Sequence, residues 1–412
     1  MILLPHHRMN AFAIALLLES FFGGVECFSS TKSLPMLSES SLTILHMSVN
    51  DEEIKKHLCL DRRSTFVSVG SLMATTTGLL FSASPAFSST SSQASDIANG
   101  SPSVTSSSVA ASIPEWTLQG GVKFPTLALN TVGLSVEETT RAVSIARKNG
   151  ITHIDFHPGK ERDGVAKYIA SSSRDGLFLT TKIRKAPQGT SPEEAAKRAK
   201  DQIDEDLKAL GVSSVDMLML RDSPDPRVIQ SQWAVLEEAL ASGKTKSIGV
   251  INFCESALKA VLKTAKVKPA LNYYMLHVGM GPDAHGLRSF GEAQGIRTFA
   301  YGAVGEPGPS EELLLSPILE KIGDAYRRST EEVALRWLLQ SGVAVSVRPT
   351  TNFDLGISSC EGALCEVELE KRSQIFGWTL SKKEMKKISA MTSPDGNPTL
   401  FSSSGCPNAF VR

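Results

Sequence analysis

Eight short runs of β-branched and aliphatic residues recur along the chain, separated by stretches with apolar residues at three- and four-residue spacing. The short runs are typical of buried strands, and the stretches between them are typical of amphipathic helices. Strands that alternate with helices build a parallel sheet with right-handed crossovers, and eight of them close into a barrel. The predicted fold class is therefore α/β, a single-domain (β/α)8 TIM barrel. The predicted strands span residues 124–130, 151–156, 177–183, 215–220, 247–252, 269–275, 296–303 and 343–349.

Glycine follows several of the predicted helices at the position where a helix ends. A residue there often adopts a left-handed backbone conformation, which glycine takes at little cost. The glycines that mark these ends are Gly150, Gly211, Gly243 and Gly342.

The N-terminal part of the chain differs in composition from the predicted barrel. Residues 28–116 are rich in Ser and Thr and show little periodic apolar pattern, whereas the usual globular mixture begins near Leu118. We therefore expect one sizeable core, in a barrel domain of residues 117–395 that is followed by a tail of residues 396–412.

Charge and cysteine usage give no support to a nucleic-acid, membrane-surface or metal-ion partner. The formal net charge at pH 7 is zero, so nothing favours a nucleic acid or an anionic membrane surface. The six cysteines have no zinc-ligand spacing, so no metal site is predicted. The oligomeric state is not predicted by any feature of the sequence.

The chain begins with a pattern typical of a targeting signal. A basic cluster at residues 6–8 precedes the apolar run AFAIALLLESFFGG, which has the order of a secretory signal and is short for a bilayer span. The predicted signal peptide is residues 1–27, and the transit-peptide-like segment of residues 28–60 then begins with Phe28. This order resembles the bipartite plastid leader of algae whose plastids lie inside extra membranes.

A second leader is predicted in residues 61–116. Arg62 and Arg63 stand before a weakly apolar stretch that ends in Ser-Pro-Ala, and this resembles a twin-arginine thylakoid signal followed by a Ser/Thr-rich linker. The protein would then start near Phe87 and work in the thylakoid lumen. The alternative is that two adjacent arginines arose by chance, in which case the protein stays in the plastid stroma. The stretch is too rich in Ser, Thr and Gly for a stable membrane span in the mature protein.

Function in such a barrel is built where the strands end, at their C-terminal side. Polar and aromatic side chains occur at or near most of the predicted strand ends. They are Asp155, Lys182, Arg221, Asn252, Tyr273, Tyr301 and Arg348.

Several longer strings resemble segments of the aldo/keto reductases, in the same order. They are HIDF, LFLTTK, DLKALGVSSVDMLML, SIGVINF, AYGAVG, EVALRWLLQSGV and WTLSKKEMKKI, and they cover roughly residues 118–395. The resemblance implies hydride transfer from NADPH to a carbonyl carbon, with a tyrosine as proton donor. It also implies a lysine that lowers the pKa of that tyrosine, an aspartate that holds the lysine, and a histidine that orients the carbonyl.

The catalytic positions match this pattern only in part. Asp155 matches the family aspartate and Lys182 the family lysine. The position of the tyrosine, a few residues after the aspartate, offers only His157 or Lys160, and Arg221 replaces the histidine.

Three interpretations remain open. In the first, His157 or Lys160 supplies the proton, while Arg221 and Lys182 bind an oxyanion or a substrate carboxylate. In the second, the barrel binds nucleotide without fast chemistry, and in the third it is a structural or regulatory barrel. The predicted function is that of an NADP-dependent oxidoreductase acting on a small-molecule carbonyl substrate, with a catalytically impaired nucleotide-binding or structural barrel as the alternative.

The cofactor positions implied by the resemblance match the family pattern more fully than the catalytic positions do. Asn252 matches an asparagine that contacts the nicotinamide carboxamide, and Tyr301 matches a tyrosine that stacks on the nicotinamide ring. Tyr273 stands where the family usually has a glutamine, so it is either a cofactor contact or a packed barrel residue. Arg348 and Thr350, with Thr351, fall near the segment that binds the 2′-phosphate of NADP(H).

An apparent insertion, DLGISSCEGALCEVELEK, follows the last predicted strand. It contains Cys360 and Cys365, which could close a small disulfide loop in an oxidising compartment. Two unpaired loop cysteines are the alternative.

Overall fold

The computed structural model describes residues 112–284, 286–303, 313–352 and 357–391. All of these residues lie within one compact unit. The predicted leader segments up to residue 111 and the predicted C-terminal tail lie outside the described residues.

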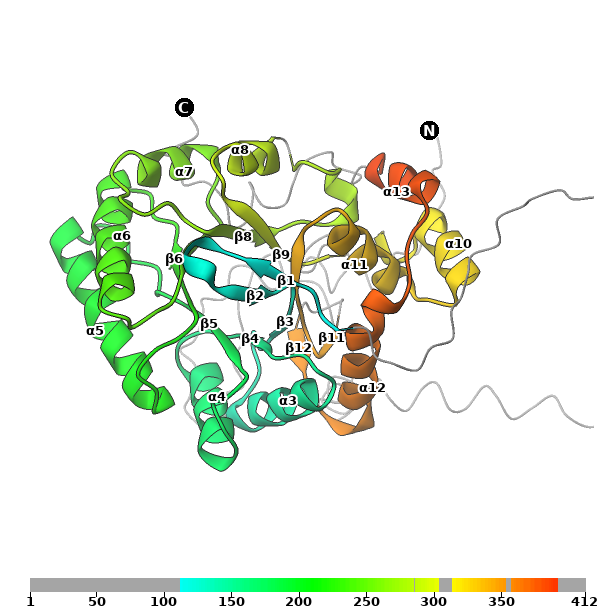
Figure 1. Ribbon diagram of the computed structural model, residues 1–412, viewed down its shortest axis with the longest axis horizontal. Helices are drawn as coiled ribbons and strands as arrows, with labels where there is room; N and C mark the ends of the chain where they lie inside the picture. Colours follow the sequence, from blue (N-terminus) through cyan, green and yellow to red (C-terminus); the bar gives the residue numbers. More distant parts are fainter. Residues whose placement is uncertain (1–111, 285, 304–312, 353–356, 392–412) are drawn as a thin grey trace, which may run out of the picture. The chain divides into compact units, whose positions relative to one another are not determined.

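Eight parallel strands form a closed barrel with helices around it (Figure 1). Their order around the barrel is β10-β3-β4-β5-β6-β7-β8-β9, so the first strand of the barrel pairs with the last. The predicted fold class is therefore confirmed. The bounds are β3 Leu127–Asn130, β4 His153–Asp155, β5 Phe178–Lys182, β6 Met217–Arg221, β7 Ile248–Ile251, β8 Leu271–Met275, β9 Arg297–Tyr301 and β10 Ala344–Val347.

The helices begin and end where the local sequence favours it. The four glycines predicted to end helices all have φ between 67° and 82°. Three of the described helices begin with a capping box, in which a serine and a glutamate three residues later bind each other's backbone N–H. The helices are α3 Val136–Lys148, α4 Lys160–Ser171, α5 Pro192–Leu210, α6 Pro226–Ala241, α7 Glu255–Leu262, α8 Leu287–Ala293, α10 Pro317–Tyr326, α11 Thr330–Gln340, α12 Gly362–Ser373 and α13 Lys382–Ser389. Within the described ranges, none is long and apolar enough to cross a membrane.

Side chains along each barrel strand alternate between the barrel interior and the layer under the helices. In β6, Met217 and Met219 belong to the interior cluster, whereas Leu218 and Leu220 belong to the cluster that the helices cover. Because the side-chain period of a strand is two, Arg221 continues the inward series. The same alternation aims the last inward side chain of each strand at the mouth of the barrel.

A short hairpin closes the opposite end of the barrel. It consists of β1 (Glu115–Thr117) and β2 (Lys123–Pro125), which pair antiparallel. Phe124 from this hairpin packs edge-on against Phe178 and Phe299 inside the barrel. The run predicted as one strand at residues 124–130 is thus divided, because Thr126 N bonds Pro114 O before the chain enters β3.

His153 lies in the interior just above this hairpin and is fully buried. Its Nδ1 donates a hydrogen bond to Pro125 O at 2.9 Å, and its Nε2 accepts one from Thr180 Oγ1 at 2.7 Å. Burial lowers the pKa of His153 to about 4. The ring is therefore neutral in the folded protein under ordinary conditions.

We expect His153 to make the fold sensitive to acid. Its folded pKa lies below that of an exposed imidazole, so the unfolded chain binds this proton first and the stabilisation is lost as pH falls from about 6.5 to 4. The loss is about 3 kcal/mol over that interval. Urea unfolding at about pH 7 and pH 4.5 should give a smaller acid-induced loss for His153→Gln than for the parent. Equal losses in the two proteins would contradict this assignment.

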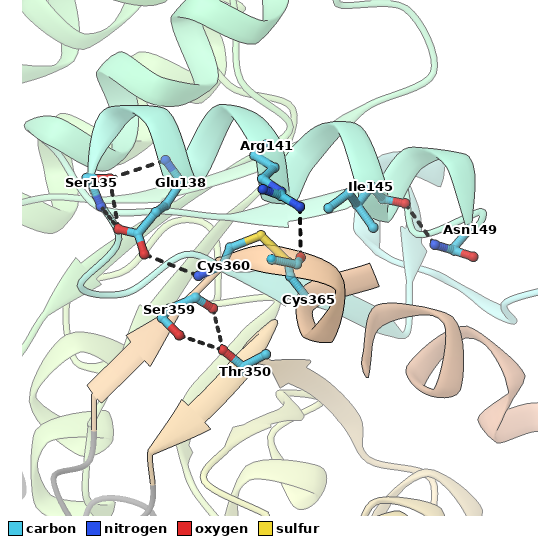
Figure 2. Close-up of a disulfide and its surroundings, with 10 residues drawn as sticks. Ser135, Glu138, Arg141, Ile145, Asn149, Thr350, Ser359, Cys360 and Cys365 are labelled. Atoms are coloured by element: carbon cyan, nitrogen blue, oxygen red, sulfur yellow. Dashed lines mark hydrogen bonds between the residues drawn. A yellow bond between two sulfur atoms is a disulfide. The ribbon is translucent and has the colours of Figure 1, made fainter. Parts of the chain in front are cut away.

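A disulfide holds the segment that follows β10. There β11 (Thr350–Asn352) and β12 (Ile357–Ser359) form a two-stranded antiparallel sheet, and Cys360 then bonds Cys365 at the start of α12. Figure 2 shows this disulfide beside α3, where Glu138 Oε1 accepts a hydrogen bond from Cys360 N at 3.2 Å. Arg141 also donates to Gly362 O at 2.8 Å. Of the two alternatives open from the sequence, the structure has the disulfide.

Removing this disulfide should destabilise the barrel. For a loop with a sequence separation of five, the loss of loop-closure entropy in the unfolded chain corresponds to about 2 kcal/mol. We expect Cys360→Ser/Cys365→Ser to lower the free energy of unfolding by that amount in urea under non-reducing conditions. Leu364→Ser, which changes an exposed side chain inside the same loop, is the control and should have little effect. The expectation fails if the two variants are equally stable.

Candidate active site

The mouth of the barrel is built around a buried ion pair. Lys182 Nζ donates to Asp155 Oδ1, and it also donates to Phe156 O at 3.1 Å. Both side chains are 0% exposed, and they come from the ends of adjacent strands β4 and β5. The structure therefore brings together the aspartate and the lysine that the sequence predicted as partners.

Burial and charge act on this pair in opposite directions. Burial is the largest single effect and raises the pKa of Asp155, but the charges of Lys182 and His157 and the hydrogen bonds from Lys182 and Tyr273 together lower it below its ordinary value. Burial and the nearby Arg221 lower the pKa of Lys182, although Asp155 acts against them. Lys182 thus gives up a proton more readily than an exposed lysine does.

Tyr273 reaches Asp155 from the far side of the barrel. Its hydroxyl donates to Asp155 Oδ2 at 2.8 Å and accepts from Asn130 Nδ2 at 3.1 Å. Ser346 Oγ donates to the same carboxylate oxygen at 3.0 Å. Burial first, and then the charge of Asp155, raise the pKa of Tyr273 well above its ordinary value. Tyr273 is thus a neutral donor that holds Asp155, and the predicted cofactor contact at this residue remains a prediction.

His157 is held beside the ion pair by a buried carboxylate. Glu161 Oε2 accepts hydrogen bonds from His157 N and from His157 Nδ1, both at 3.0 Å. Glu161 is itself fixed by Gly133 N at 3.0 Å and by Thr131 Oγ1 at 3.2 Å. Because Nδ1 donates to Glu161, Nε2 is the ring nitrogen left to exchange a proton.

The surroundings of His157 favour its neutral form. Burial is the largest cause that lowers its pKa, and the charge of Lys182 acts in the same direction. Glu161 and Asp155 oppose these effects without reversing them. A proton on His157 is therefore released readily.

The other predicted proton donor, Lys160, is not part of the buried cluster around the ion pair. Lys160 is exposed at the start of α4, and its Nζ donates to Gly133 O at 3.2 Å. Tyr168 is on the same helix and is buried in the outer core. Within the described residues, neither Lys160 nor Tyr168 forms a hydrogen bond with His157 or Glu161.

Arg221 ends β6 and is partly buried. Its charge acts on Lys182 and on Asp222. Asp222 is bound by Lys185 Nζ at 3.0 Å, and burial raises the pKa of Asp222. The positively charged end of β6 thus adjoins the ion pair.

Two predicted cofactor residues meet at the rim. Tyr301, at the end of β9, donates from its hydroxyl to Asn252 Oδ1 at 3.0 Å. Asn252 follows β7 and has φ 60°, a left-handed conformation that costs most residue types energy. The ring of Tyr301 is partly exposed and packs edge-on against Tyr273, with centroids 5.1 Å apart. Tyr301 therefore presents part of an aromatic ring at the mouth.

The predicted phosphate-binding residues follow β10. Arg348 is partly buried directly after the strand. Thr350 donates from its hydroxyl to Ser359 O at 2.6 Å, a contact visible in Figure 2, so this hydroxyl joins β11 to β12. A phosphate contact of Thr350 through that hydroxyl would have to replace this hydrogen bond.

Three residues of the site were not predicted from the sequence. Asn130 and Ser346 could have been found by counting alternate positions along β3 and β10 from Ala128 and Ala344, which face the interior. Glu161 gave no comparable signal, since a glutamate in the first turn of a helix is common.

The buried ion pair should show strong energetic coupling. Removing one partner leaves an uncompensated buried charge, which typically costs about 3–5 kcal/mol. We expect Asp155→Asn and Lys182→Met each to cost about 3 kcal/mol in urea unfolding, and the double variant to cost less than the sum by more than about 1 kcal/mol. The exposed pair Lys197–Asp201 is the control cycle and should show a coupling below about 0.5 kcal/mol. Additive losses at Asp155 and Lys182 would refute the coupling.

Comparison with known proteins shows which family this chain resembles. A model of the aldo/keto reductase family matches residues 124–392. Morphine 6-dehydrogenase of Pseudomonas putida is 28% identical over 284 residues, which is 66% of this chain and 88% of that protein. Glyoxal reductase of Bacillus subtilis is 27% identical over 278 residues, 66% of this chain and 91% of that protein.

Solved structures agree with the sequence relatives. An aldo/keto reductase from Brucella melitensis is 27% identical with a TM-score of 0.57, covering 68% of this chain and 99% of that one. A variant of Gox0644 in complex with NADPH is 25% identical with a TM-score of 0.58, covering 70% of this chain and 97% of that one. The chain therefore belongs to the aldo/keto reductase family.

Proposed function

We propose that this barrel binds NADP(H) and reduces the carbonyl group of a small molecule. The observation that carries the proposal is the buried Asp155–Lys182 pair at the mouth, with His157 held next to it by Glu161. The relative named glyoxal reductase and the Gox0644 structure with NADPH support the same reaction class and cofactor.

The residues at the mouth fit a nicotinamide nucleotide. The partly exposed ring of Tyr301 offers an aromatic surface for stacking, and Asn252 offers an amide beside it. Arg348, directly after β10, offers a guanidinium, which suits a phosphate group. We therefore assign the nicotinamide end to Tyr301 and Asn252, and the 2′-phosphate to the segment that begins at Arg348.

The chain then has to deliver one proton. When NADPH is bound, it supplies a hydride to the carbonyl carbon, so that the C=O π bond breaks and its electron pair remains on oxygen. In our proposal His157, when protonated, passes a proton from Nε2 to that oxygen while Nδ1–H stays on Glu161, and the product is an alcohol. Lys182, with a lowered pKa and a positive charge, stabilises the developing oxyanion.

A catalytically impaired barrel is the second candidate function. It is favoured by the described part of the mouth, where the hydroxyl of Tyr273 is bonded to Asp155 and that of Tyr301 to Asn252. Neither phenol lies on the segment after β4, where the resemblance would put the proton donor. In this alternative the barrel binds nucleotide and does not turn over.

Titration with NADPH, followed by tryptophan fluorescence, should give saturable binding that Arg348→Glu weakens by roughly tenfold or more.

NADPH oxidation with a panel of aldehydes and ketones should then be roughly 100-fold slower in His157→Gln, because a general acid typically contributes about 10²- to 10⁴-fold. Lys160→Gln is the matched control and should remain near the parent rate. Reduction should also slow as pH rises through a pKa below the ordinary imidazole value, because the protonated ring is the donor.

The outcomes separate the two candidates. Absence of NADPH binding at millimolar concentration would exclude both. Binding without oxidation by any carbonyl compound would favour the impaired barrel. An equal loss in His157→Gln and Lys160→Gln would remove His157 from the mechanism.

A further inference from the structure

Arg221 carries a positive charge at the mouth, and this charge acts on the neighbouring Asp222 and Lys182. Its strand sends Met217 and Met219 into the barrel interior, and the same alternation points Arg221 inward at the C-terminal end. Among the residues that the structure describes, none forms a hydrogen bond or an ion pair with its guanidinium. With no partner among those residues, its N–H donors are available to a ligand.

The nearby carboxylates are already bound to other groups. Asp155 is paired with Lys182, and Glu161 is held by His157 and two further donors. Asp222 is paired with Lys185, and Asp225 with Arg227 at 2.8 Å. The end of β6 therefore has an excess of positive charge facing the mouth.

Strand order separates this charge from the proposed cofactor phosphate. In the closed order, β6 lies four strands from β10 in either direction, so their ends are on opposite sides of the mouth. Arg348 follows β10 and Arg221 ends β6. A nucleotide that uses the β10 side leaves the β6 side open for the substrate.

We propose that Arg221 binds a carboxylate of the substrate, so that the preferred substrates are small oxo acids. This rests on the proposed function, since it names the substrate class of the same site. Guanidinium and carboxylate form paired, charge-assisted hydrogen bonds, which an uncharged aldehyde cannot supply. Reduction adds one hydride and one proton to the carbonyl group and leaves the carboxylate unchanged, so the product is a hydroxy acid.

The test uses pairs of carbonyl compounds that differ only in charge. They are phenylglyoxylate and para-carboxybenzaldehyde, each compared with its methyl ester, so that the carboxylate is next to the carbonyl in one pair and across a ring in the other. The parent protein should prefer the acid of at least one pair by about 10- to 100-fold in kcat/KM. Arg221→Gln should abolish that preference mainly through KM, and Arg221→Lys should keep part of it.

Arg227→Gln is the matched control, because it removes one positive charge nearby from an exposed arginine that already has its own carboxylate. It should keep the preference for the acid. Equal use of acid and ester by the parent, or an equal loss for both in Arg221→Gln, would overturn the carboxylate site and leave the reductase standing.

If neither the acids nor the esters are reduced, these compounds give no support to the proposed function, and benzoate binding then tests Arg221 alone. Line broadening of the benzoate signals by the parent, lost in Arg221→Gln and kept in Arg227→Gln, would support the anion site without any turnover. The same broadening in all three proteins, or none in the parent, would overturn it.

Discussion

Burying the ammonium of Lys182 requires a carboxylate, and the mouth of the barrel is organised around meeting that requirement. Asp155 supplies the charge, but its second oxygen is buried too and needs donors of its own. Tyr273 and Ser346 provide them from β8 and β10, which reach the barrel axis from other sides. The buried charge of Lys182 on β5 is thus supported by residues on three other strands, β4, β8 and β10.

Two of the changes from the family pattern, at Tyr273 and at Arg221, have different physical effects. A phenol at Tyr273 is long enough to cross the barrel and bind Asp155, so it strengthens the support of the ion pair. Arginine at position 221 places a guanidinium, which only donates hydrogen bonds, where the family has an imidazole, which can also accept one. The change at Tyr273 therefore acts on the support of the ion pair, and the change at Arg221 acts on the charge beside it.

The sequence predicted most of the fold because the signals for strands and helix ends are local. Eight apolar runs, the helical spacing between them and the glycines after the helices were enough to predict the barrel. Asp155 and Lys182 could be paired because adjacent parallel strands end side by side. The support of His157 by Glu161, and of Asp155 by Tyr273, could not be predicted, because each depends on distances across the folded chain. The split at Thr126 was missed because the hairpin and β3 are both rich in apolar residues.

The hydrogen bond between Glu138 and Cys360 is a second link between the first and last strand–helix segments of the barrel, in addition to the pairing of β3 with β10. The strands β3 and β10 already pair through the sheet, and the carboxylate that caps α3 also binds the segment after β10. Without contacts of this kind, the β3–β10 junction would depend on the sheet pairing alone, because no short loop connects these two strands. Separating β3 from β10 also disturbs the contact of the glutamate that caps α3. Local opening at this junction is therefore coupled to the cooperative unfolding of the barrel.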